Sequence, residues 1–244
     1  MKCIVLDIET AGVPFEELSV STREYLLRWN QTTAEQEETK KKTGLWAPFG
    51  EIVSIALFKP DDSAPRTAAG ELAGEATIIY NDSSGSIPAL PSPYPGVRLR
   101  EPIGGSEQVM LETFWKGIAA YDRIITFNGR GFDAPFLLQR SVIHGVKASR
   151  DLMPSRFYGL KSHFDLLEVL TFFSASRRFN LETWAEAVGA INPKDEGITG
   201  AEVAAYWREG RIAEIAAYNL RDVLATWQLY RRVNFTMPWL TGSG

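Results

Sequence analysis

Residues 3–8 read CIVLDI, an apolar run in which both alternating faces are hydrophobic. This pattern is typical of a central strand that is covered on both sides. The run meets two acids, Asp7 and Glu9, which leave the same face of a strand because they stand two residues apart. Ligand sites of α/β sheets concentrate at the carboxyl ends of strands. A strand end that emerges into solvent would explain the same pair, so the pair alone does not decide its role.

The remaining elements alternate between strands and helices along the chain. Further strands are predicted at residues 51–58, 76–80, 97–99 and 123–127. Helices are predicted after Ser106 and at residues 133–144, 180–188 and 212–232. Three early strands followed by alternating helices and strands predict an α/β fold, with a mixed five-stranded sheet that carries helices on both faces.

The length of 244 residues suits one large domain with insertions. Residues 13–43 are polar and favour helix, which is typical of an insertion at the surface. Residues 60–105 are rich in Pro, Gly and Ser and predict a long irregular excursion. We therefore expect a single domain over residues 1–244 with these two elaborations.

Composition limits the classes of protein to which the chain can belong. Hydrophobic residues make up 45% of the chain, which is enough to close a globular core. The single cysteine, Cys3, cannot form an intramolecular disulfide, and two histidines are too few for a zinc cluster, so we expect a cytoplasmic protein. Residues 1–12 resemble neither a signal peptide nor a membrane span, and no membrane role is expected.

The net charge of −4 does not indicate a polyanionic partner. Residues 130–178 contain eight basic and four acidic residues, which would suit a local surface for nucleic acid. Scattered charge on a solvated face explains this count equally well.

The last predicted helix contains an acid on its apolar face. A rotation of about 100° per residue places Ile215, Tyr218, Asp222, Ala225 and Leu229 in one stripe. Burying an ionised carboxylate without a partner is costly, so Asp222 requires a cation, a hydrogen-bond network or a metal. A salt bridge from an arginine would satisfy it as well.

Asp133 allows two interpretations. Asp followed by Ala134 and Pro135 is a good helix start, in which the carboxylate caps free amides. Asn128 and Gly129 end the preceding strand, however, and predict a flexible turn before Asp133 where a substrate could approach. Carboxylates gathered around one cavity stay ionised only when cations compensate them. Hard oxygen ligands select Mg²⁺ or Mn²⁺, and two such ions suit phosphodiester hydrolysis.

Three segments together resemble the exonuclease motifs of the DnaQ-like DEDD superfamily, in the right order. They are LDIET (residues 6–10), FNGRGFD (residues 127–133) and YNLRD (residues 218–222). The tyrosine four residues before the last aspartate is similar to the tyrosine variant. The chain is also similar to bacterial proteins related to the exonuclease domain of family-B DNA polymerases. This similarity rests on the segments HFDLLEVL, FNLETWAEAVG and 203–230. The order of elements resembles the ribonuclease-H-like fold.

The resemblance implies a role for each acid. Asp7 would bridge two divalent metal ions, Glu9 and Asp222 would serve the first ion, and Asp133 would serve the second, partly through water. Tyr218 would hydrogen-bond the nucleophilic water. Its position fits, because residues four apart share a helix face.

The resemblance also suggests residues that contact the substrate. Thr10 would contact the terminal nucleotide, and Asn128 would help to hold the scissile strand. Asp165 would line the substrate groove, although an acid at the start of the HFDLL segment suits a helix cap equally well.

We therefore expect a metal-dependent 3′-5′ exonuclease that acts on 3′ ends of single-stranded DNA or RNA and releases nucleoside 5′-monophosphates. A catalytically silent module that binds nucleic acid or a partner remains an alternative, as does a hydrolase of short oligonucleotides. The sequence leaves open the choice between DNA and RNA, and the oligomeric state. A proofreading or repair role would need a polymerase or repair partner in trans.

Overall fold

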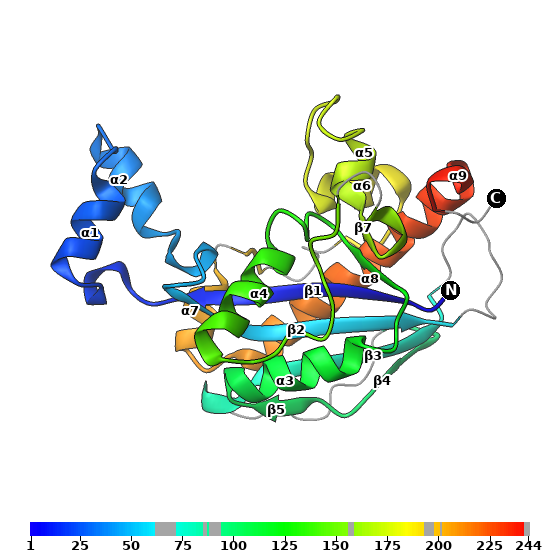
Figure 1. The fold of residues 1–244 in the computed structure, drawn as a ribbon, viewed down its shortest axis with the longest axis horizontal. Coiled ribbons are helices and arrows are strands. Elements are labelled where there is room, and N and C mark those ends of the chain that lie inside the picture. The colour runs from blue at the N-terminus through cyan, green and yellow to red at the C-terminus, as the bar shows by residue number, and fades with distance from the viewer. Residues whose placement is uncertain are drawn as a thin grey trace.

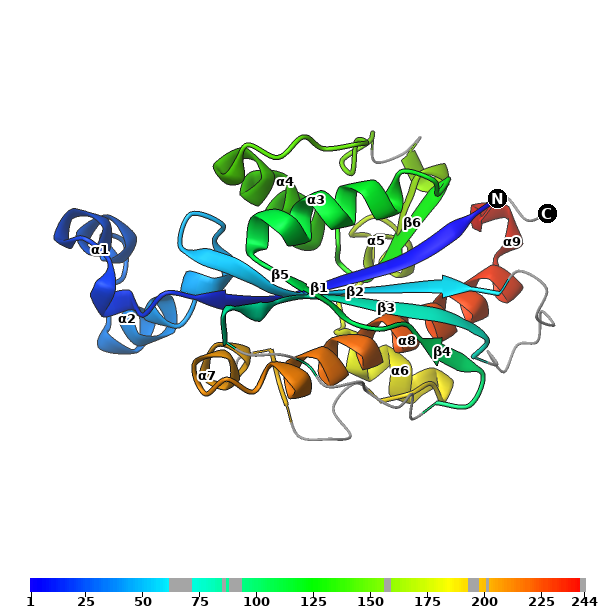
Figure 2. The same ribbon diagram turned by 90° about the horizontal axis from the view of Figure 1, so that it is seen from below.

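The computed structural model describes residues 1–61, 72–84, 87, 94–155, 159–192, 198–200 and 202–241. A mixed sheet runs through the middle of the molecule, and helices cover both of its faces (Figures 1 and 2). Helices α3 (Glu107–Ile118) and α4 (Asp133–His144) lie on one face, and the long helix α8 (Ile212–Thr236) lies on the other. Within the described residues no helix is long and apolar enough to cross a membrane.

The sheet has the order β4-β3-β2-β1-β6-β7, with β5 paired to β3 off this path. Its strands are β1 (Cys3–Gly12), β2 (Gly50–Pro60), β3 (Gly74–Asn81), β4 (Val97–Leu99), β5 (Ile103–Gly105), β6 (Arg123–Thr126) and β7 (His163–Asp165). Strands β1 and β2 are antiparallel, as are β2 and β3, whereas β6 runs parallel to β1. The predicted mixed sheet with helices on both faces is confirmed, and the arrangement is ribonuclease-H-like.

The prediction of five strands was wrong, because the described residues form a sheet of seven strands. The two strands that the sequence did not indicate, β5 and β7, have three residues each. Strands this short have too few residues to show an alternating pattern. Much of the predicted excursion at residues 60–105 lies outside the described residues, and its described part adds β3, β4 and β5 to the sheet.

The other helices are short. They are α1 (Val20–Leu27), α2 (Thr33–Lys40), α5 (Leu166–Leu170), α6 (Leu181–Val188), α7 (Val203–Arg208) and α9 (Pro238–Thr241). Single 3₁₀ turns occur at Phe15–Glu17, Thr43–Leu45, Asp82–Ser84 and Gly159–Lys161. Helices α4 and α6 end at residues 144 and 188, as predicted, and each is followed by a glycine in the left-handed region, Gly145 or Gly189, where the lack of a Cβ removes the strain.

Strand β1 separates two hydrophobic cores, as its double-sided apolar pattern predicted. Cys3 and Val5 belong to the core beneath α8, whereas Ile4, Leu6 and Ile8 belong to the core beneath α3 and α4. Residues Asp7 and Glu9 continue the series of Cys3 and Val5. They therefore face the side of the sheet on which α8 lies.

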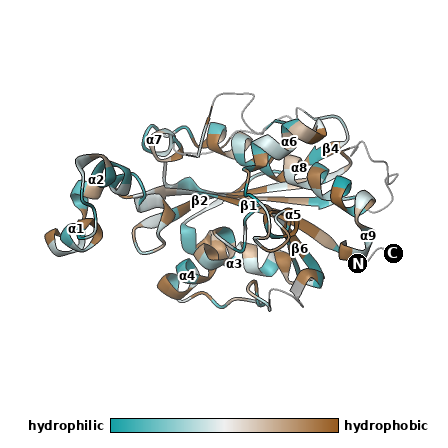
Figure 3. Ribbon diagram, turned by 90° about the horizontal axis from the view of Figure 1, so that it is seen from above, coloured by the Kyte–Doolittle hydropathy of each residue, from teal (hydrophilic) through white to brown (hydrophobic). Residues whose placement is uncertain are grey.

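Residues 13–43 leave the end of β1 and form an arm that contains α1 and α2. All three views place this arm at one end of the molecule, beyond the end of β1 (Figures 1, 2 and 3). Neither helix of the arm has a buried residue. Helix α2 begins with a capping box between Thr32 and Glu35, which satisfies free amides at its first turn.

Candidate metal and nuclease site

Three carboxylates converge between the central strand and the long helix. Oxygen atoms of Asp7, Glu9 and Asp222 all lie within 4.8 Å of one another. The two acids of β1 share a face because of the strand period, and α8 packs across that face with its apolar stripe. Glu9 and Asp222 are each 8% exposed, so little solvent screens their charges. The structure thus brings together three of the four predicted metal ligands.

The fourth acid, Asp133, lies beside this group but is held differently. Its carboxylate accepts a hydrogen bond from the Ile8 amide at 3.0 Å, which ties the first turn of α4 to β1. Asp133 begins α4 as predicted, but Phe132 occupies the N-cap position, and the first-turn amide from which the Asp133 carboxylate accepts a hydrogen bond is its own. Asp133 is nevertheless close enough to raise the pKa of both Asp7 and Glu9.

The electrostatics of the acids favour a bound cation. Burial raises the pKa of Asp7 and Glu9 well above the ordinary values, and repulsion from the neighbouring carboxylates raises it further. Burial likewise raises the pKa of Asp133 to about 7. Burial and mutual repulsion disfavour the charged forms of these side chains, and a divalent ion, which prefers hard oxygen ligands, would compensate their charge.

Asn219 is a site residue that the sequence analysis missed. Its Nδ2 donates a hydrogen bond to Asp7 at 2.6 Å, and its Oδ1 accepts one from Ser54 at 2.9 Å. Both Asn219 and Ser54 are fully buried. Ser54 lies in an apolar strand and Asn219 in a buried helix. A polar residue in a buried segment needs a hydrogen-bond partner, and this signal in the sequence could have identified both residues. The pair fixes the orientation of Asp7.

Tyr218 lies one helical turn before Asp222, as predicted, and is 8% exposed. Burial raises the pKa of its hydroxyl above the ordinary value, and the charges of Asp222, Glu9 and Asp7 raise it further. A hydrogen bond with Asp222 acts in the same direction. The hydroxyl therefore stays neutral and can donate a hydrogen bond beside the three acids.

Asp165 organises the turn that precedes α4. Its carboxylate accepts hydrogen bonds from the amides of Asn128 at 2.9 Å and Arg130 at 2.8 Å. It also caps α5 by accepting from the Leu167 amide, so the helix-cap alternative is confirmed. The expectation that Asp165 contacts the substrate has to be corrected. The side chain is 1% exposed and its oxygens are occupied by backbone amides.

Asn128, for which a contact with the substrate was predicted, lies close to Asp7 and Asp222. Its φ of 62° places it in the left-handed region, which asparagine tolerates. A Cβ at Gly131 would lie 2.5 Å from the side-chain oxygen of Asn128, so a larger residue there would displace that oxygen. Arg178 donates a hydrogen bond to the same oxygen at 2.8 Å.

A hollow of about 440 Å³ opens beside the acids. It is lined by Asp7, Asp222, Asn128, Arg178, Asn180, Phe127, Leu167, Phe179 and Leu181. The hollow combines carboxylates, an exposed guanidinium and apolar faces, a set that suits a nucleotide with its phosphate, sugar and base.

Thr10 lies next to Glu9, and its contact with the terminal nucleotide stays a prediction. Its hydroxyl donates to the carbonyl of Gly44 at 2.7 Å, which joins β1 to the base of the arm. The β1–β2 register shifts between Glu9 and Thr10, and such a bulge bends the strand. Thr10 is not among the residues that line the 440 Å³ hollow.

Comparison with known proteins agrees with this geometry. Residues 97–243 match a family described as a predicted 3′-5′ exonuclease related to the exonuclease domain of PolB. The match includes Asp133, Tyr218 and Asp222. It begins after Asp7 and Glu9, whose place in the site therefore rests on their convergence with Asp222.

Curated relatives are archaeal DNA polymerases. The chain is 30% identical over 141 residues to a DNA polymerase of Pyrococcus glycovorans, covering 52% of this chain and 18% of the relative. It is 33% identical over 144 residues to a DNA polymerase of Thermococcus litoralis, covering 51% and 8%. The chain thus spans less than a fifth of the length of these relatives. It belongs to the family of predicted 3′-5′ exonucleases related to the exonuclease domain of PolB.

Proposed function

We propose that this chain removes nucleotides stepwise from the 3′ end of single-stranded nucleic acid, with DNA preferred to RNA, and releases nucleoside 5′-monophosphates. The observation that carries the proposal is the convergence of Asp7, Glu9 and Asp222 within 4.8 Å. The adjacent hollow can hold a terminal nucleotide.

The acids fit two divalent ions, Mg²⁺ or Mn²⁺. The pKa values of Asp7, Glu9 and Asp133 are raised, and together with Asp222 these acids form a set of hard oxygen donors. Asp7 would contact both ions, Glu9 and Asp222 would hold one, and Asp133 would serve the other. When bound, such ions supply positive charge at the attacking and leaving oxygens of the phosphodiester.

The side chains around the acids have separate tasks in this proposal. Asn219 holds Asp7 in the orientation that faces the hollow. Tyr218 stays neutral and positions the attacking water by a hydrogen bond. Arg178, held by Asn128, faces the phosphate, and Phe179 offers a surface for a base.

A ladder assay tests the proposal. Single-stranded DNA and RNA of one sequence, labelled at the 5′ end, are incubated with Mg²⁺ or Mn²⁺, and released mononucleotides are identified by chromatography. We expect stepwise shortening that is lost in Asp222→Asn and retained in Glu112→Gln, an exposed acid on α3. Absence of shortening of both polymers with both metals would overturn the proposal.

The same assay separates the two alternatives. Binding of single strands without any hydrolysis, unchanged by Glu9→Gln, would indicate a catalytically silent module. Faster hydrolysis of dinucleotides than of long strands would indicate a hydrolase of short oligonucleotides. We also propose that the protein acts with a polymerase or repair partner, which a stimulation of activity by the added partner would test.

A further inference from the structure

The arm presents large aromatic side chains to solvent. Trp29 is 80% exposed and Tyr25 is 58% exposed. The guanidinium carbon of Arg28 lies 3.9 Å from the centre of the Tyr25 ring and 5.3 Å from that of Trp29. Exposed apolar groups of this size commonly mark a binding surface. We call Tyr25, Arg28 and Trp29 the arm stack.

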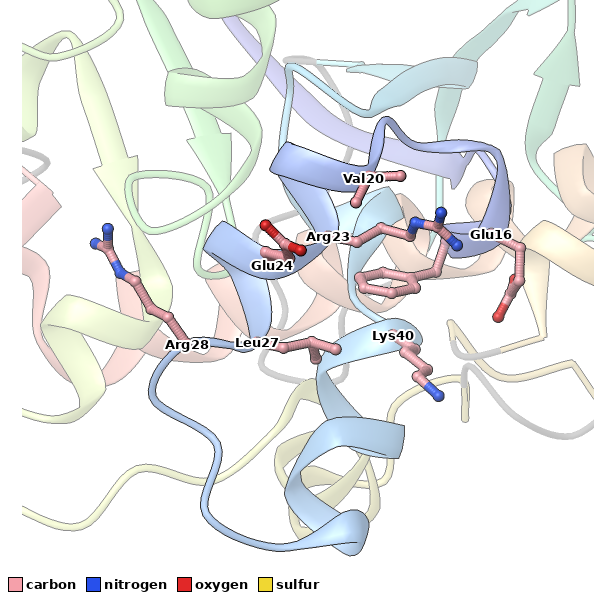
Figure 4. Close-up of a pocket in the computed structure, with 8 residues that line it drawn as sticks. Glu16, Val20, Arg23, Glu24, Leu27, Arg28 and Lys40 are labelled. Atoms are coloured by element: carbon pink, nitrogen blue, oxygen red, sulfur yellow. The ribbon is translucent and has the colours of Figure 1, made fainter.

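A cavity of about 590 Å³ within the arm is not the binding surface that we infer. It is lined by Phe15, Glu16, Val20, Arg23, Glu24, Leu27, Arg28 and Lys40, which mix acids and bases (Figure 4). Figure 4 shows Arg28 extending away from the other side chains of this cavity. Its guanidinium lies instead over the aromatic rings of Tyr25 and Trp29.

A groove of about 530 Å³ joins the arm to the catalytic body. It is lined by Tyr25, Leu26, Leu45, Trp46, Ala47, Pro48, Phe49, Gly131, Phe132, Pro135, Phe136 and Gln139. One wall of the groove thus comes from Tyr25 and Leu26 of the arm and from residues 45–49, and the other comes from the turn before α4 and from α4 itself. Its lining includes five aromatic residues, which suits bases better than phosphates.

The groove and the catalytic hollow lie on the same turn. Asn128 lines the hollow next to Asp7 and Asp222, whereas Gly131 and Phe132 line the groove. A strand whose 3′ end occupies the hollow can therefore cross this turn and continue along the groove toward the arm stack.

We propose that the arm binds the same single strand upstream of its 3′ end, with unpaired bases stacking on Tyr25 and Trp29 and with Arg28 contacting the backbone. This inference rests on the proposed function, because it takes the strand from the catalytic hollow. It assigns to residues 13–43 a role in holding long substrates.

Stacking, rather than charge, has to supply most of the binding to the arm. Residues 13–43 contain six glutamates and five basic residues, namely Arg23, Arg28, Lys40, Lys41 and Lys42. A nearly neutral surface releases few counterions when it binds a polyanion. Stacking accepts any base, so the arm would add affinity without sequence preference.

Binding is measured by fluorescence anisotropy in an Asp222→Asn background, where the labelled strand stays intact. The test variant is Tyr25→Ala with Trp29→Ala, and the matched control is Trp239→Ala. Trp239 is 72% exposed on α9, at the end of the molecule opposite the arm (Figure 1). Tyr25, Trp29 and Trp239 are all exposed. Thermal unfolding verifies that each variant folds.

We expect the double variant to weaken the binding of DNA longer than about 16 nucleotides by about tenfold for each ring removed. The slope of affinity against salt concentration should stay unchanged in the double variant. It should fall by about 0.7 in Arg28→Ala, which removes one contact to the backbone. In the otherwise wild-type protein, the double variant should hydrolyse a dinucleotide at the normal rate, because so short a substrate occupies only the hollow.

Unchanged affinity of the double variant for long strands would overturn the inference, whether or not the protein is an exonuclease. If the arm instead binds a protein partner, affinity for single strands will be unaffected, and the inference fails in the same way. If the double variant loses binding and the wild-type protein hydrolyses nothing, the inferred binding surface is supported and the proposed function is refuted.

Discussion

Replacement of Asp133 by asparagine is expected to stabilise the metal-free protein above neutral pH. The side chain is 4% exposed, and burial raises its pKa from the ordinary 3.8 to about 7. The folded state therefore binds more protons than the unfolded state between these two values. Stability falls as the pH rises through this window, because the buried carboxyl has to ionise.

The size of the effect follows from the two pKa values of Asp133. Their difference corresponds to a cost of about 4 kcal/mol once the pH exceeds about 7. About 2 kcal/mol of this cost is already present near pH 5. Asparagine keeps an oxygen that can accept the Ile8 amide, so Asp133→Asn removes the charge and preserves that hydrogen bond. We expect its advantage over wild type to grow by about 2 kcal/mol from about pH 5 to about pH 8.

Urea unfolding in EDTA at these two pH values measures the effect. Glu107→Gln is the matched control. Burial raises the pKa of Glu107, but hydrogen bonds from Arg140 and the Ile52 amide lower it more, so the net shift is downward. The control should destabilise the protein near pH 8. An equal difference between Asp133→Asn and wild type at both pH values would refute the reasoning. Added Mg²⁺ should stabilise wild type more than the variant.

Four further predictions follow from buried polar side chains in and around the site. Tyr218→Phe should lower kcat by about 10²-fold or more with little change in KM, as steady-state kinetics would show, because the water loses its hydrogen bond. Asn219→Ala should lower kcat and also cost about 1–3 kcal/mol of unfolding free energy in chemical denaturation, since it leaves Ser54 without its acceptor. Asp165→Ala should raise amide hydrogen exchange at Asn128, whose amide loses its acceptor, and unchanged protection there would contradict the positioning role. Burial lowers the pKa of His163 from 6.5 to about 4. The contribution of the neutral side chain to stability is therefore present above about pH 6.5 and is lost as the pH falls toward 4. The total loss of unfolding free energy is about 3 kcal/mol. His163→Gln should flatten this acid-side loss in urea unfolding measured over that range.

Residues whose role depends on local periodicity could be predicted from the sequence. The alternation of CIVLDI placed Asp7 and Glu9 on one face, and the stripe on the last helix placed Asp222 among buried side chains. The end of α4 at Gly145 is equally local, because a left-handed residue is needed where a helix stops. These features depend on neighbours within a few positions, and the sequence displays such neighbours directly.

The partners of the buried polar groups were decided only by the tertiary structure. Ser54 meets Asn219 across 165 positions, and Asp133 meets Ile8 across 125. A periodic pattern shows which face of an element is buried, but it does not show which distant donor that face will meet. The sequence alone therefore determined the central strand and the candidate acids. The packing of α8 and α4 against β1 determined how each acid is held, because a hydrogen bond between distant segments exists only after the chain has folded.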